Sequence, residues 1–205
     1  TKGVTAFCPT SMTLEEDYLV DIFKTAKSDL PNDCADIVGV HMEGPFISSS
    51  KKGAQDEKFI VNPSIDFFKN LNDACGNMIK IITMAPEVDG GLDFIKEMSK
   101  EVSISMGHTV ADYDTSKKAF ENGANRVTHL FNAMPAFNHR NPSVVGASLD
   151  NEDVFVEVIS DGIHLHESVV RAIFKMYGDD RVVLVSDSIM ATGMGQGVYE
   201  LGGQQ

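Results

Sequence analysis

The stretch VGVHMEGPF, Val38–Phe46, is a run of strand-forming residues that ends on a carboxylate and is then broken by Gly44-Pro45. A β-strand that is buried on both faces is a near-continuous apolar run, and residues 36–42 come close to that pattern. We therefore expect Glu43 to lie where a buried parallel strand ends and its loop begins.

Short apolar runs of this kind recur along the chain, and most precede a segment with helical periodicity. Strands that alternate with helices predict a parallel sheet with helices outside it. The predicted strands are Gly3–Cys8, Ile37–Met42, Met78–Met84, Val102–Met106, Arg126–Phe131, Val154–Ser160 and Arg181–Ser186. The predicted helices are Thr13–Ser28, which starts with a Thr13/Glu16 capping box, and Ser64–Ala74, Leu92–Ser99, Asp112–Glu121 and Glu167–Tyr177.

Such units fit either an open doubly wound sheet or most of a (β/α)₈ barrel. An open sheet concentrates its chemistry at one switch point, often with a Gly-rich phosphate loop, but GMGQG at Gly193–Gly197 lacks that spacing. Barrel enzymes instead place polar residues after many strands. Polar residues at or just past the predicted strand ends are Glu43, Glu87, His108, His129, Asp161 and Asp187. We therefore predict an α/β fold, a TIM-type barrel lacking one strand, with residues 1–205 as a single domain.

Composition excludes several classes of protein. The 205 residues are 42% hydrophobic and carry a net charge of −13, which argues against a nucleic-acid surface. No apolar run reaches the roughly 18 residues of a membrane span, and nothing at Thr1 resembles a signal peptide. The cysteines, Cys8, Cys34 and Cys75, are odd in number and widely spaced, so neither a disulfide framework nor a zinc ribbon is implied. A cytoplasmic protein is the simplest expectation.

Glu43, His108 and His129 lie on three predicted strands at one face of the barrel. Two imidazoles and a carboxylate form a catalytic metal set that leaves a coordination position open for water. Taken singly, each histidine also fits a polar residue that caps a strand end. Zinc, iron and other divalent metals all suit this ligand set.

Asp187, in VVLVSDS, ends the last predicted strand. A carboxylate there could act as general base and then as general acid beside a metal-bound water, although a turn aspartate before glycines fits the same pattern. Arg140 and His164 follow other strands at this face and suit an anionic substrate, because the planar fork of Arg matches phosphate.

The linked motifs resemble one enzyme family. HMEGPF with KKGAQ, SMGHTVADYD, THLFNAM, SDGIH and LVSDSIMATGMGQGVYELGG are similar to segments of N-acetylglucosamine-6-phosphate deacetylases of the amidohydrolase superfamily, in the same order and over essentially the whole chain. The resemblance implies a metal-dependent (β/α)₈ barrel that hydrolyses the acetamide of N-acetylglucosamine-6-phosphate. It also implies a homodimer in which a neighbouring subunit helps to close the phosphate site.

By the same resemblance, Glu43, His108 and His129 would bind the divalent metal, zinc or iron, and Asp187 would be the catalytic acid/base. The substrate contacts that it implies are Ala54, Gln55, Asn132, Ala133, Arg140 and His164.

Relatives of this family begin with a small β-sandwich and a first barrel strand that bears an H-x-H or H-x-N pair. Neither is found here, so we expect the sandwich and the first strand to be missing, and a second metal to depend on that pair. Two alternatives stay open: another amidohydrolase, and a truncated inert domain that binds metal or sugar phosphate without turnover.

Overall fold

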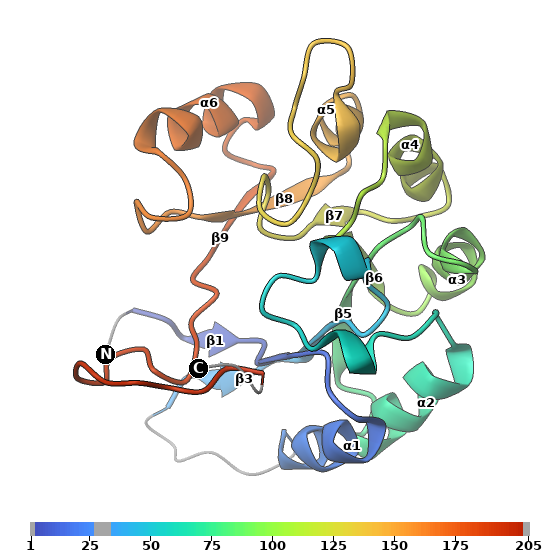
Figure 1. The fold of residues 1–205 in the computed structure, drawn as a ribbon, viewed down its shortest axis with the longest axis vertical. Helices are drawn as coiled ribbons and strands as arrows, with labels where there is room; N and C mark the ends of the chain where they lie inside the picture. The colour runs from blue at the N-terminus through green and yellow to red at the C-terminus, as the bar shows by residue number, and fades with distance from the viewer. Residues whose placement is uncertain (1–2, 27–33, 203–205) are drawn as a thin grey trace.

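The computed structural model describes residues 3–26 and 34–202 (Figure 1). Within these residues, seven parallel strands form one curled sheet in the order β2-β4-β5-β6-β7-β8-β9. Helices α1 to α6 follow one another in chain order around its outer side (Figure 1). This is the α/β arrangement that the alternation of strands and helices predicted.

The strands of the curled sheet are β2 (Thr10–Ser11), β4 (Val40–Glu43), β5 (Ile79–Met84), β6 (Ser103–Met106), β7 (Arg126–Val127), β8 (Phe155–Ile159) and β9 (Val182–Val185). A separate two-stranded sheet pairs β1 (Ala6–Phe7) with β3 (Asp36–Ile37). The helices are α1 (Glu16–Thr25), α2 (Ile65–Ala74), α3 (Gly91–Met98), α4 (Tyr113–Glu121), α5 (Ser143–Leu149) and α6 (Glu167–Tyr177), with short 3₁₀ turns η1 (Ser49–Lys51) and η2 (Glu57–Phe59).

The first two predicted strands are each divided in the structure. Gly3–Cys8 was wrong as a strand of the main sheet, because β1 pairs with β3 and Pro9, which has no amide hydrogen, separates it from β2. The second predicted strand is divided into β3 and β4, with Val38 and Gly39 between them. At Gly39 the chain passes so close to its neighbour that a Cβ would lie 2.4 Å from Lys80 Cγ, and the register shifts between Val40 and His41. The other predicted strands occur with adjusted ends.

Two predicted helix starts are confirmed by their capping bonds. Ser64 accepts a hydrogen bond from Phe67 N at 3.2 Å, and Asp112 accepts one from Thr115 N at 2.8 Å. The Thr13/Glu16 capping box was wrong, because α1 starts at Glu16 with no side-chain cap and the Thr13 side chain is fully buried. Positions Lys27 and Ser28 of that predicted helix lie outside the described residues.

Helix α5 was not predicted. It has only seven residues, and six of them are buried, so it shows no polar face from which an amphipathic period could be recognised.

The sheet curls but does not close within the described part of the chain. Strands β2 and β9 are its two edges, and neither is paired with the other. The apolar core lies between helices and strands, with Phe46 packed edge-on against Phe94 at 5.2 Å between ring centroids. Among the described residues, no helix is long and apolar enough to cross a membrane.

Candidate functional site

The chemically active side chains gather where the parallel strands end. Glu43 is the last residue of β4, while His108 and His129 come two residues after β6 and β7, and Asp187 comes two after β9. Because the carboxyl ends of parallel strands meet at one edge of a sheet, these residues converge although they are far apart in sequence.

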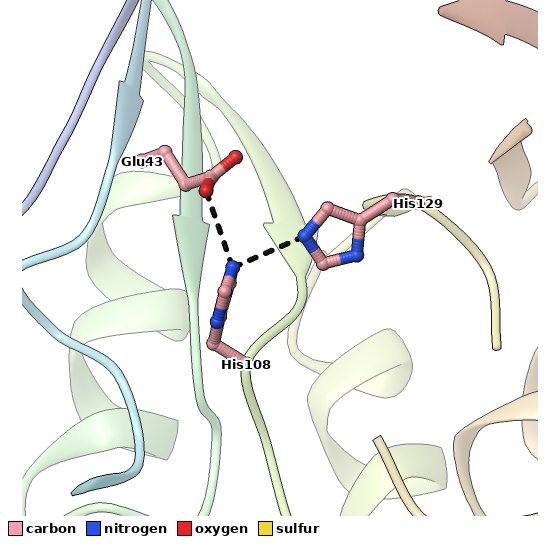
Figure 2. A group of neighbouring side chains, drawn as sticks. All are labelled: Glu43, His108 and His129. Atoms are coloured by element: carbon pink, nitrogen blue, oxygen red, sulfur yellow. Dashed lines mark hydrogen bonds and ion pairs between the residues drawn. The ribbon is translucent and has the colours of Figure 1, made fainter. Parts of the chain in front are cut away.

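Figure 2 shows the closest group, which consists of Glu43, His108 and His129. Glu43 Oε1 lies 3.2 Å from His108 Nε2, and that nitrogen lies 3.1 Å from His129 Nε2. The possible ligand atoms of all three residues lie within 4.8 Å of one another. Their exposed fractions are only 8%, 6% and 5%, so the group is largely shielded from water.

The surroundings of His108 determine which of its nitrogens faces this group. His108 Nδ1 lies 2.8 Å from the carbonyl oxygen of Lys51, an acceptor, so Nδ1 carries the hydrogen and donates. In the neutral ring, Nε2 therefore presents a lone pair toward Glu43 and His129. Electron-pair donors that converge on one point are satisfied by a cation, and two imidazoles with a carboxylate fit a divalent metal.

The pKa values agree with an anionic carboxylate among imidazoles. Burial alone would raise the pKa of Glu43. The hydrogen bond that His108 donates when its Nε2 is also protonated, and the positive charges of the two histidines in their protonated forms, outweigh burial and lower this pKa to about 2. Burial lowers the pKa of His129. It acts in the same direction on His108, where Glu43 outweighs it and raises the pKa. Glu43 is thus ionised at neutral pH, as a metal ligand must be.

Three of these residues have backbones in the left-handed region. The φ angles are +48° at His108, +30° at His129 and +47° at Asp187. Such conformations cost about 1–3 kcal/mol each in residues other than glycine and persist where the surrounding structure enforces them. Each of the three lies two residues past the end of a strand, with a bend at His108 and a turn at His129.

A hollow of about 940 Å³ opens above the group. All but one of the expected metal ligands, acid/base and substrate contacts line it: Glu43, His108, His129, Ala54, Gln55, Asn132, Ala133, His164 and Asp187. Asp187 also lines a small recess of about 60 Å³ together with Glu43 and His129. A carboxylate therefore borders the space in front of the metal-type group.

Arg140 is the exception. It lies beside a different hollow, which it lines with Asp112, Tyr113 and Asp150 among others. Within this one chain, the structure does not bring Arg140 to the side chains that it was expected to join.

Asp161 has a supporting role that the sequence did not assign. Its carboxylate accepts hydrogen bonds from the backbone amides of Ile163 and His164 and lies 2.7 Å from His164 Nδ1. These backbone bonds, followed by the His164 side chain, lower the pKa of Asp161 to about 2. The Asp-Gly pair in SDGIH is the signal for such a turn.

Gln55 is buried beside Glu43, with 3% of its surface exposed. Its Oε1 accepts a hydrogen bond from Thr13 N at 2.6 Å, and its Nε2 donates to Glu43 Oε1 at 3.0 Å. Because the amide of Thr13 can only donate, the orientation of the Gln55 side chain is fixed and its NH₂ group must face the carboxylate. Gln55 therefore holds Glu43 in place.

We expect Gln55→Leu to weaken divalent-metal binding about 10-fold or more, because Glu43 loses the donor that orients it. Calorimetric titration with Zn²⁺ measures the change. Ser48→Ala is the matched control, since the buried Ser48 side chain contacts Ser50 rather than a ligand. Equal Zn²⁺ affinity in wild type and Gln55→Leu would contradict this role.

The chain is similar to named enzymes over nearly its whole length. The N-acetylglucosamine-6-phosphate deacetylase of Bacillus subtilis is 37% identical over 211 residues, which cover 99% of this chain and 53% of that protein. The enzyme of the same name from Homo sapiens is 35% identical, with 99% and 52% covered. No family model matches the sequence. The chain spans about half the length of the curated relatives that it matches.

Solved structures give the same result. An aspartate-to-alanine mutant of N-acetyl-D-glucosamine-6-phosphate deacetylase from Mycobacterium smegmatis, in complex with N-acetyl-D-glucosamine-6-phosphate, superimposes with a TM-score of 0.91 at 32% identity, covering 98% of this chain and 52% of the other. The N-acetylglucosamine-6-phosphate deacetylase of Thermotoga maritima gives 0.88 at 34% identity, with 98% and 54% covered.

Proposed function

This chain is a homologue of the N-acetylglucosamine-6-phosphate deacetylases, and on that premise we propose that it hydrolyses the acetamide of N-acetylglucosamine-6-phosphate to glucosamine-6-phosphate and acetate. The observation that carries the proposal is the convergence of two buried imidazoles and a buried carboxylate beside Asp187 in one hollow. The activity belongs to the breakdown of amino sugars, and we place it in the cytoplasm on the cysteine pattern of the sequence.

Glu43, His108 and His129 would hold the divalent ion, which we propose to be zinc or iron. When bound, such an ion polarises the acetyl carbonyl and lowers the pKa of a bound water to near neutrality. Three protein ligands would leave a coordination position for that water. The burial of Glu43, His108 and His129 shields them from bulk solvent.

Asp187 would move the proton that the reaction requires. Its carboxylate borders the same hollow and accepts a proton from the attacking water, then returns it to the departing nitrogen. Without that proton, the leaving group would be an amine anion, which is far too basic to depart at neutral pH. An acid/base carboxylate is therefore essential to this chemistry.

The remaining lining residues would orient the sugar. We assign these contacts to the backbone and side chains of Ala54, Asn132 and Ala133, to the second hydrogen of the Gln55 amide, and to His164. Asp161 holds His164 through its Nδ1, so the opposite nitrogen is free for a substrate oxygen.

We further propose that the curled sheet is the main part of a (β/α)₈ barrel formed by residues 1–205 as one domain. The high TM-scores with two deacetylases support this assignment. The unpaired edges of β2 and β9 also support it, because one more strand between them would close the ring.

Acetate release by the purified protein tests the proposal. We expect N-acetylglucosamine-6-phosphate to be deacetylated and N-acetylglucosamine, which lacks the phosphate, to react poorly. Turnover of only cyclic amides or nucleoside amines would instead identify another amidohydrolase. Metal or sugar-phosphate binding with no acetate from any substrate would show an inert binding domain.

Arg140 would reach the phosphate of a neighbouring subunit in a homodimer, since it lies away from the hollow of its own chain. We expect Arg140→Ala and Asp187→Asn to be nearly inactive separately and to recover about a quarter of wild-type activity when unfolded and refolded together in equal amounts. Half of the dimers are then hybrids. Each hybrid has one complete site, whereas a wild-type dimer has two, so the mixture reaches about a quarter of the wild-type activity. A mixture as inactive as its components would contradict the shared site.

A further inference from the structure

Glu87 stands at the end of β5 and takes no part in the proposed reaction. Both of its carboxylate oxygens are used by the neighbouring loop after β6. Thr109 Oγ1 donates to Glu87 Oε2, and Val110 N donates to Glu87 Oε1 at 2.7 Å. These donors belong to the two residues that follow His108. Glu87 therefore fixes, through hydrogen bonds, the segment that directly follows a proposed metal ligand.

Thr109 makes two further hydrogen bonds, one within its own loop and one to the loop that follows β7. Its side chain is fully buried, and its Oγ1 accepts a hydrogen bond from Ala111 N at 2.9 Å. Its own backbone amide donates to the carbonyl oxygen of Ala133 at 3.1 Å, in the loop that carries His129. Glu87 and Thr109 therefore tie together the loops that follow β5, β6 and β7.

The backbone of His108 needs such support. Its φ of +48° is strained for a residue with a Cβ, and it relaxes unless neighbouring bonds hold it. One side of His108 is held by its own contacts, with Ser48 N donating to its carbonyl oxygen at 2.9 Å and Nδ1 facing Lys51. The following residues are held by Glu87.

We propose that Glu87 is a positioning residue for the metal, acting through Thr109 to keep the strained turn at His108 in the geometry that binds a divalent cation. This inference rests on the proposed function only for the identity of the metal ligands. A bond network outside the ligands commonly changes metal affinity 10- to 100-fold, because it fixes the direction of the ligand's lone pair.

The test is titration of the metal-free full chain with Co²⁺ alone, following both affinity and the visible absorption bands of the bound ion. We expect Glu87→Gln and Thr109→Val each to weaken Co²⁺ binding about 10- to 100-fold and to alter the bands. Both substitutions keep the size of the side chain. The double variant should bind Co²⁺ about as weakly as either single variant, because both substitutions act on the same hydrogen bond between Thr109 and Glu87. Thr109→Ser keeps the hydroxyl that donates to Glu87 and should therefore retain most of the wild-type affinity for Co²⁺.

Asp112→Ala is the matched control. Asp112 caps α4 in the same loop through Thr115 N but does not contact the Glu87–Thr109 pair, so its loss should lower the melting temperature and leave Co²⁺ affinity unchanged. If Asp112→Ala weakens Co²⁺ binding as much as Glu87→Gln does, Glu87 only stabilises the loop and the inference fails.

The remaining outcomes separate this inference from the proposed function. If Glu87→Gln and Thr109→Val bind Co²⁺ with wild-type affinity and show the wild-type absorption bands, the positioning role is wrong, although the proposed metal site still stands. Failure of the wild-type chain to bind Co²⁺ would overturn both the positioning role and the metal site.

Discussion

Asp187→Asn should lower kcat for acetate release about 10³-fold while leaving metal content unchanged. Asparagine keeps the size of the side chain and tolerates the left-handed backbone of this position, but it cannot accept and return a proton. Loss of proton transfer acts on the chemical step, so KM should change much less than kcat.

Asp180→Asn is the matched control for this variant. It makes the same change of charge before the start of β9, the strand whose other end carries Asp187, and Asp180 does not line the hollow. Its kcat should equal that of the wild type. An Asp187→Asn protein that retains a tenth or more of wild-type kcat would rule out Asp187 as the acid/base.

His129→Ala should remove the metal. Deleting one of three buried ligands leaves Glu43 and His108 facing a gap, and we expect metal affinity to fall more than about 100-fold and acetate release to fall with it. Metal per chain after dialysis, measured by mass spectrometry on the sample used for activity, checks both effects. Treating the wild type with a chelator should reproduce the loss of activity, and added Zn²⁺ should reverse it only in the wild type.

His166→Ala serves as the comparison. His166 is an exposed histidine that accepts a hydrogen bond from Ser168 N at the start of α6 and lies outside the hollow. It should retain metal and activity. Full metal content and turnover in His129→Ala would show that His129 is not a ligand.

The convergence of the site could be predicted because it follows from topology. Once the alternation of strands and helices predicts a parallel sheet, polar residues at the strand ends must share one edge, wherever they occur in the sequence. Glu43, His108 and His129 satisfy that rule, and the structure places them together. Their roles in binding and catalysis remain proposals.

The supporting contacts could not be predicted, because they depend on distances between loops. The sequence shows Gln55 in a polar loop, but the fold buries it between Thr13 and Glu43. Glu87 was seen at a strand end, yet its hold on Thr109 depends on how two loops meet. Arg140 was expected beside the other substrate contacts, but it lines a different hollow.

The strained backbones at His108, His129 and Asp187 have a consequence for the engineering of this protein. Glycine and asparagine adopt a positive φ more easily than histidine or aspartate, so these positions are local weaknesses of the fold. Directed evolution that rewards heat resistance alone should therefore enrich glycine or asparagine there and yield robust but inactive variants. A screen that also demands turnover should keep the original residues and gain its stability elsewhere in the chain.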